Sequence, residues 1–415
     1  MSLLPGADVV IIMARMVRGV LFVALGLFAC ADPGATPSFP TLVEVRTPDN
    51  VQTDLLIDVK NLDTGDLGYV VAFHNGHGLP TTLSYNSQSQ ILGEGPPPFE
   101  TLIGTAIFPG AIAAGPLAQA PADVLVVLDG PAVAQTKVTY SVPYECNGMP
   151  QHLSGTSTFT FFPGGRIVRF DNATANDTAL ERAMTTNDFT CNAGMMNDSV
   201  LFFTSFWTFL DMSSMITTPD GTAIDTGAQG FIDYNQSSAC FRYPDLGVHI
   251  GIRYTGSQTR VIDNVEVMRP DAGSADRFVF DFARNPPMLD AGFQDEVGSA
   301  IQLSPSAVAT CQSLLDPLED RGVFVNDRTT PLDRDGIYSD SGGNYGDRVT
   351  IQAGSRGLLP GFVVALAGVH GHLRVASSGA GQFYVPQLDR DGQRTLIWFR
   401  DALEPGATIE VELLE

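Results

Sequence analysis

The chain has 415 residues, of which 46 are acidic and 23 are lysine or arginine, so its formal net charge is −23. A polypeptide this acidic is repelled by nucleic acid, which excludes general nucleic-acid binding from the functions we expect. Its length exceeds what one hydrophobic core usually serves, so two domains are expected.

The N-terminal region has the pattern of an export signal. Arg15 and Arg18 precede an uncharged apolar run at residues 19–29. That run is too short to span a bilayer, since spanning takes about 20 residues. A basic start followed by an apolar middle and a small residue is the order of a secretory signal peptide. The true start is expected at Met13 or Met16, and the protein is expected to be exported.

The end of this signal resembles the lipobox of bacterial lipoproteins, because residues 27–30 read Leu-Phe-Ala-Cys. The resemblance implies that residues 1–29 are removed as the signal peptide and that the Cys30 thiol carries lipid. Ala31, in place of Asp, implies retention at the outer membrane, with the periplasmic or the surface face left open. The alternative is an ordinary signal peptide cut nearby, with Cys30 as an incidental thiol.

Composition divides the remaining chain into three parts. Residues 30–45 are small and proline-rich, which is typical of a flexible tether. The composition of the sequence changes again near residue 320, where a predicted helix ends. We therefore expect one domain at 46–320 and a second at 321–415.

Apolar and polar residues alternate along most of both domains, which predicts an all-β fold with few helices. Glycine-containing turns separate many of the runs, as hairpins require. The expected strands are 55–59, 67–73, 124–128, 136–142, 157–162, 166–170, 248–254, 260–267 and 277–282 in the first domain, and 322–326, 347–352, 362–367, 373–377, 395–399 and 408–413 in a small C-terminal β-sandwich.

Two segments carry helix signals. Ser304 followed by Pro305 predicts a helix start, because a hydroxyl side chain caps the first turn and proline suits the first helical position. The apolar positions that follow, up to Leu315, can form one helix face. Residues 177–186 are a weaker helix candidate.

With Cys30 lipidated, four cysteines remain, at Cys146, Cys191, Cys240 and Cys311. An even number in an exported protein predicts two disulfides, and four cysteines allow three pairings. Proximity in the sequence favours Cys146–Cys191 and Cys240–Cys311. Zinc binding by these cysteines is disfavoured, because none of them forms the close pairs that zinc sites use.

A hairpin-rich segment begins at Asp129-Gly-Pro131 and ends with the two strands that flank residues 163–165, up to Asp171. It resembles galactose-mutarotase-like β-supersandwich domains, which recur in carbohydrate-active proteins. The resemblance implies a large antiparallel double sheet with a carbohydrate-facing side. No histidine–glutamate pair of the mutarotase type matches, so it implies no catalytic residues.

One strand gathers the best catalytic candidates, His249, Arg253 and Tyr254. Strand alternation places His249 and Arg253 on one face and Tyr254 on the other. An arginine could neutralise a uronate carboxylate, while histidine or tyrosine abstracts the neighbouring proton, as a polysaccharide lyase requires. The alternative is a solvent-facing strand with its polar residues outward.

Asp333, Asp335 and Asp340 lie in a loop rich in aspartate and glycine. Alternating aspartates with a glycine at the bend is how calcium loops gather oxygen ligands, so Ca²⁺ is a possible ligand here. The complete EF-hand pattern is absent, and Asp-Gly also forms ordinary tight turns.

Taken together, these patterns predict a lipid-anchored cell-envelope protein that binds a polysaccharide or another envelope component without chemistry. A polysaccharide lyase or glycoside hydrolase is the first alternative. A structural or adhesive envelope lipoprotein, using the C-terminal sandwich for contacts, is the second.

Overall fold

The computed structural model describes the following residues: 41–47, 53–61, 67–74, 80–85, 106–109, 124–146, 149–175, 180–182, 189–191, 199–202, 205–210, 215–225, 230–243, 248–255, 260–268, 277–284, 294–304, 310–370, 372–377, 384–389 and 392–414. The predicted signal peptide and Cys30 lie outside them. No helix in these ranges is long and apolar enough to cross a membrane.

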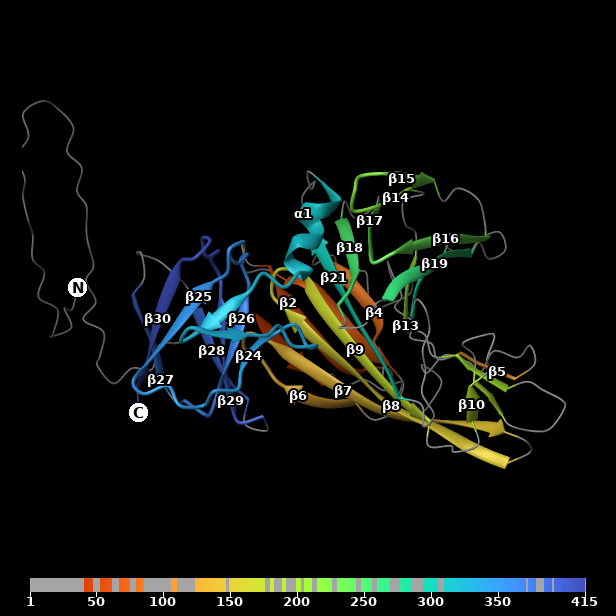
Figure 1. The fold of residues 1–415 in the computed structure, drawn as a ribbon, viewed down its shortest axis with the longest axis horizontal. Helices are drawn as coiled ribbons and strands as arrows, with labels where there is room; N and C mark the ends of the chain where they lie inside the picture. Colours follow the sequence, from red (N-terminus) through yellow and green to blue (C-terminus); the bar gives the residue numbers. More distant parts are fainter. Residues whose placement is uncertain are drawn as a thin grey trace, which may run out of the picture. The chain divides into compact units, whose positions relative to one another are not determined.

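A nine-stranded antiparallel sheet runs through the larger part of the described chain (Figure 1). Its strands, in spatial order, are β15 (Ala223–Asp225), β14 (Met215–Thr217), β17 (Ser238–Tyr243), β18 (Val248–Tyr254), β21 (Gln294–Ser304), β9 (Arg166–Ala175), β8 (Met149–Phe162), β7 (Ala134–Cys146) and β6 (Val124–Leu128).

Three four-stranded sheets accompany it. The first has the order β1 (Val43–Arg46), β2 (Thr53–Lys60), β3 (Leu67–His74), β4 (Pro80–Tyr85). The second has the order β10 (Leu180–Arg182), β11 (Phe189–Cys191), β12 (Ser199–Phe202), β5 (Ala106–Pro109). The third has the order β13 (Ser205–Leu210), β20 (Arg277–Arg284), β19 (Arg260–Met268), β16 (Gly230–Gln236).

The C-terminal part contains two further sheets. One has the order β23 (Arg328–Thr330), β22 (Val323–Val325), β25 (Arg348–Ala353), β30 (Thr408–Leu414), β27 (His372–Ser377). The other has the order β24 (Tyr338–Asp340), β26 (Val363–Ala367), β29 (Arg394–Phe399), β28 (Tyr384–Asp389). A hydrophobic cluster drawn only from residues 323–413 fills this part, as expected for a small sandwich.

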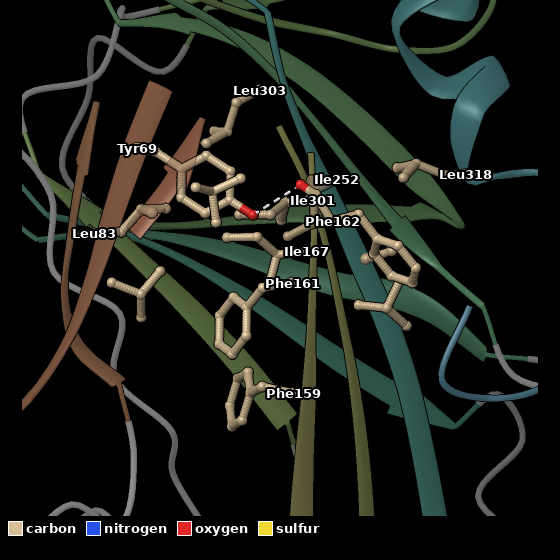
Figure 2. Close-up of a cluster of buried hydrophobic side chains, with 14 of the residues drawn as sticks. Tyr69, Leu83, Phe159, Phe161, Phe162, Ile167, Ile252, Ile301, Leu303 and Leu318 are labelled. Carbon is tan, nitrogen blue, oxygen red and sulfur yellow. Dashed lines mark hydrogen bonds between the residues drawn. The ribbon is translucent and has the colours of Figure 1, made fainter. Parts of the chain in front are cut away.

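Successive residues of a strand point to opposite sides of a sheet, and this alternation builds the main core. Figure 2 shows Tyr69 and Leu83 facing Phe161 and Ile167 across the space between two sheets. The Tyr69 hydroxyl donates a 3.1 Å hydrogen bond to the Phe162 carbonyl. The two sheets are therefore joined by apolar packing and by one buried polar contact.

The described chain is thus nearly all sheet, and the predicted all-β class is confirmed. The helix predictions need correction. Ser304 is the last residue of β21, and the helix α1 covers only Cys311–Leu315. Its N-cap is Thr310, whose side chain forms a capping box with Ser313. Asp316–Leu318 continues as a 3₁₀ turn, η2.

The second helix candidate, residues 177–186, is wrong at its described residues. Residues 180–182 form β10, which pairs antiparallel with β11. Pairing with a neighbouring strand satisfies the backbone there, and such tertiary context routinely outweighs a weak local helix propensity.

Candidate functional site

Strand β18 positions two of the predicted site residues on one face of the nine-stranded sheet. His249, Gly251 and Arg253 alternate with Ile250 and Ile252, which are completely buried on the opposite face. The predicted distribution over the two faces of this strand is therefore confirmed. The face with His249 and Arg253 is the one on which α1 lies.

The helix α1 divides this face at Gly251. A β-carbon at Gly251 would lie 3.0 Å from Leu314 Cγ and 3.1 Å from Leu315 Cδ2, so the helix rests directly on the strand backbone. Because side chains extend from the strand on both sides of this contact, His249 and Arg253 are separated by the helix. Each borders a different cavity.

Arg253 borders a cavity of about 480 Å³, which we call the Ala300 cavity. Ala300 and Val168, paired across β21 and β9, belong to its lining, and the small side chain of Ala300 leaves room above the sheet. The remaining lining residues are Arg166, Arg253, Tyr254, Thr255, Pro317, Leu318, Glu319, Asp320, Leu332, Asp333, Arg334 and Gly336.

The loop before β24 forms one boundary of the Ala300 cavity by resting on the sheet. Gly336 has a φ of +81°, and a β-carbon there would lie 2.7 Å from Val168 Cγ2. Only glycine allows this backbone conformation and this close approach together. A residue from the C-terminal part of the chain is thereby placed at a cavity built on β9 and β21.

Arg253 is paired with Glu319, and the two side chains are 29% and 14% exposed. Glu319 also accepts hydrogen bonds from Arg356 and from Gln312 Nε2. Desolvation raises the pKa of Glu319, but these hydrogen bonds and the charge of Arg253 outweigh it and hold the pKa below its ordinary value. Arg253 is therefore held in place by a carboxylate beside the cavity.

Arg166 borders the same cavity and is partly buried. Its Cζ lies 3.9 Å from the centroid of the Phe162 ring, and its Nη1 donates to the Pro317 carbonyl at 3.4 Å. Burial lowers the pKa of Arg166 to about 10, so the side chain remains cationic at neutral pH. Its Nη2 has no hydrogen-bond partner among the described residues.

Arg166 also lines a second cavity, of about 300 Å³. We call it the Tyr338 cavity, because Tyr338 is one of its lining residues. It shares four lining residues with the Ala300 cavity: Arg166, Pro317, Glu319 and Leu332. Apolar residues such as Leu358 and Phe362 line much of the remainder. The Arg166 side chain is thus common to two neighbouring cavities.

His249 lies away from both, in a cavity of about 540 Å³ that also includes Asp220, Arg242 and the disulfide-bonded Cys240 and Cys311. Desolvation and then the positive charge of Arg242 lower the pKa of His249. The ring is therefore disposed to be neutral, but it does not share a cavity with Arg253.

Tyr254 is 8% exposed and belongs to the main hydrophobic core. It borders the Ala300 cavity at the end of β18, while strand alternation directs its side chain to the opposite face from Arg253. The side chains of the three catalytic candidates therefore do not converge: Arg253 borders the Ala300 cavity, Tyr254 packs into the core, and His249 borders another cavity. Their catalytic role stays a prediction.

The three aspartates of the predicted calcium loop do not share a common site, and each has different neighbours. Asp340 is paired with Arg328 at 2.8 Å, and Asp335 accepts from the Ile337 N–H at 3.1 Å. Asp333 lies on the boundary of the Ala300 cavity. Across the described ranges, no three His, Cys, Asp or Glu side chains are grouped so that they could hold a metal ion.

The Cys240–Cys311 disulfide is present, which confirms that pairing. It ties β17 to the first residue of α1. Cys146 and Cys191 belong to β7 and β11, but their side chains lie outside the described residues, so their pairing stays a prediction. The lipidation of Cys30 also stays a prediction.

Sequence reasoning missed Arg166 and Glu319 as site residues. The hairpin over residues 163–165 was recognised, and its register places Arg166 opposite Phe162. That register predicts a guanidinium beside an aromatic ring. The contact with Pro317, 151 residues further along the chain, leaves no signal in the local pattern.

Comparisons with known proteins add a weak likeness to three solved structures. No protein family and no curated protein matches the sequence. A heparan sulfate lyase HepC mutant from Pedobacter heparinus is 9% identical with a TM-score of 0.32, over 77% of this chain and 42% of that one. Galactose 1-epimerase from Lactobacillus acidophilus NCFM is 11% identical with a TM-score of 0.33, over 63% and 98%. A GalM/aldose epimerase homologue from C. elegans is 10% identical with a TM-score of 0.28, over the same shares.

The chain thus spans about two fifths of the length of the lyase, and it has a weak structural similarity to aldose epimerases. TM-scores of this size assign neither a substrate nor a reaction to this protein.

Proposed function

We propose that this protein is an exported, lipid-anchored carbohydrate-binding protein of the cell envelope, and that the Ala300 cavity is its binding site. The observation that carries the proposal is the composition of that cavity. Arginine and carboxylate side chains surround a floor of small and apolar residues, within the volume range typical of ligand sites.

This composition suits sugars for a simple chemical reason. A sugar ring presents hydroxyl groups that donate and accept hydrogen bonds. Guanidinium groups supply the complementary donors, and carboxylates supply the complementary acceptors. Apolar residues such as Leu318 and Leu332 can contact the C–H faces of the ring. Arg253 and Glu319 hold each other in position, so part of the polar surface is ordered before a ligand arrives.

Binding is favoured over lyase chemistry by the position of His249. A lyase needs its base close to the group that neutralises the uronate carboxylate. Here the helix α1 lies on Gly251, between His249 and Arg253, and the two residues border separate cavities.

The proposal is tested with a glycan array probed with the full-length protein, followed by calorimetry on the best ligand. Ala300→Leu is expected to weaken binding at least tenfold, because the larger side chain fills the floor of the cavity. His249→Ala, in the separate cavity, is the control and is expected to leave affinity unchanged. Failure to bind any glycan overturns the proposal. Release of an unsaturated, ultraviolet-absorbing product from a uronate polysaccharide would replace it with the lyase alternative.

Lipid anchoring is proposed from the Leu-Phe-Ala-Cys pattern at residues 27–30. Mass spectrometry of the N-terminal peptide is expected to find acyl chains on Cys30, and Cys30→Ala is expected to release the protein from membranes. An unprocessed leader in a cytosolic fraction would overturn both export and anchoring.

A further inference from the structure

The Arg166 guanidinium is the one cationic group of the Ala300 cavity that forms no ion pair within the described residues. Arg253 is paired with Glu319, and Arg334 with Glu296. Arg166 makes one 3.4 Å hydrogen bond, to the Pro317 carbonyl, although a guanidinium carries five N–H donors. Its Nη2 is buried and has no partner among the described residues.

Arg166 forms no ion pair within the described residues, and the Asp335 carboxylate acts on it through its charge alone. Burying a guanidinium that makes few hydrogen bonds is costly, because the lost hydration is only partly replaced. The structure nevertheless holds this guanidinium firmly, with its carbon 3.9 Å from the centre of the Phe162 ring. A planar guanidinium fixed against a ring matches the paired oxygens of a carboxylate or a sulfate. A ligand carrying such a group could accept hydrogen bonds from the N–H groups of Arg166 that border the cavity.

We propose that Arg166 recognises an anionic substituent of the bound carbohydrate, either a uronate carboxylate or a sulfate ester. This inference rests on the proposed function and names the ligand class for the same site. Arg166 lines both the Ala300 cavity and the Tyr338 cavity, so its guanidinium can be reached from either space. The anion-binding arginine is then Arg166, since Arg253 is already paired with Glu319.

The rim of the cavity provides an independent test of ligand charge. Asp333 is exposed on the cavity boundary, where its carboxylate repels an anionic ligand. Its backbone holds the turn through bonds to Ile337 and Gly336, so a side-chain change preserves the turn. Asp333→Asn is therefore expected to strengthen the binding of an anionic ligand and to leave a neutral one unaffected.

The experiment is isothermal titration calorimetry of the full-length protein with matched probes. Tetragalacturonate is compared with its methyl ester, which is the same sugar without charge, and a sulfated carrageenan tetrasaccharide with its desulfated form. Arg166→Gln is expected to lower affinity for the charged probe about 10- to 100-fold, the range for hydrogen bonds to charged groups. Asp333→Asn is expected to raise it about two- to fivefold.

The control is Arg348→Gln on β25, an exposed arginine paired with Glu412, and it is expected to leave affinity unchanged. Binding confined to tetragalacturonate or to the sulfated probe supports the proposal and identifies the anion. Equal affinity for the charged and neutral forms of a probe overturns the role of Arg166 but leaves the proposed carbohydrate binding intact. If Arg166→Gln does not fold, an unchanged affinity of Asp333→Asn for the charged probe overturns the role of Arg166. If no glycan binds at all, the proposed carbohydrate binding is overturned as well.

Discussion

The side-chain amide of Gln387 is hydrogen-bonded to the backbone of Val133 as a neighbouring strand would be. Its Oε1 accepts from the Val133 N–H at 2.8 Å, and its Nε2 donates to the Val133 carbonyl at 2.9 Å. The same Oε1 accepts from the Ala132 N–H at 3.1 Å. Gln387 lies on β28, so one buried amide joins the C-terminal sandwich to the segment before β7.

Replacing this amide by an apolar group of similar size is expected to destabilise the protein. Gln387→Leu leaves three buried backbone groups without partners, and each such group costs about 1–3 kcal/mol. We expect the free energy of unfolding in urea to fall by about 3 kcal/mol. Gln352→Leu, which removes one exposed bond to Gly406, is the control and is expected to change it by less than about 0.5 kcal/mol. Equal effects of the two substitutions would contradict a stabilising role for the buried hydrogen bonds of Gln387.

The close approach of α1 to β18 makes Gly251 sensitive to any added atom. Gly251→Ala places a methyl group 3.0 Å from Leu314 Cγ, and overpacking of this kind costs about 2 kcal/mol. Leu314→Ala is expected to relieve the clash, so the double variant is less destabilised than the sum of the two single variants by about 1 kcal/mol. A double-mutant cycle from urea denaturation measures this coupling, and strict additivity would contradict the contact.

The Cys240–Cys311 disulfide closes a long loop, with the two cysteines 71 positions apart. In the chain-entropy model a loop of this length contributes about 4 kcal/mol by restricting the unfolded chain. Cys240→Ser with Cys311→Ser is expected to lower the free energy of unfolding by that amount. Reductant is expected to destabilise the native protein more than the double-serine variant. The same response in both proteins would contradict this contribution.

Strands with one side facing a core were the predictable ones. The β18 strand was expected at 248–254 and is found there, since Ile250 and Ile252 alternate with polar neighbours. The helix start was not predictable from capping residues alone. Ser304 is typical of a cap, but it pairs with His249 at the end of β21, and the strand ladder extends past the local helix signal.

The candidate site was predictable in part. Alternation assigned Arg253 and His249 to one face, but the helix that separates them rests on Gly251 through Leu314, which lies far along the chain. The enclosure of Arg166 likewise depends on Pro317. Contacts between such distant residues follow from the tertiary fold, and no local spacing encodes them.

Glu319 gives the site a stability contribution that depends on pH. Its folded-state pKa is lowered from the ordinary value of 4.5, because hydrogen bonds from Arg356 and Gln312 and the charge of Arg253 outweigh the opposing effect of desolvation. A carboxyl group with a lowered folded-state pKa stabilises the fold above its unfolded pKa, and the contribution is lost as the pH falls through the folded-state pKa.

Glu319→Gln is therefore expected to lower the free energy of unfolding by about 1 kcal/mol at pH 7, the scale of a partly exposed ion-pair network. The difference from the native protein is expected to be intact at pH 6, to shrink below pH 4.5 and to vanish in stronger acid. Urea denaturation at each pH measures it, and Glu404→Gln, an exposed substitution, is the control. A difference that persists unchanged in strong acid would show that the Glu319 side chain acts through packing, because a protonated carboxyl and an amide carry the same charge.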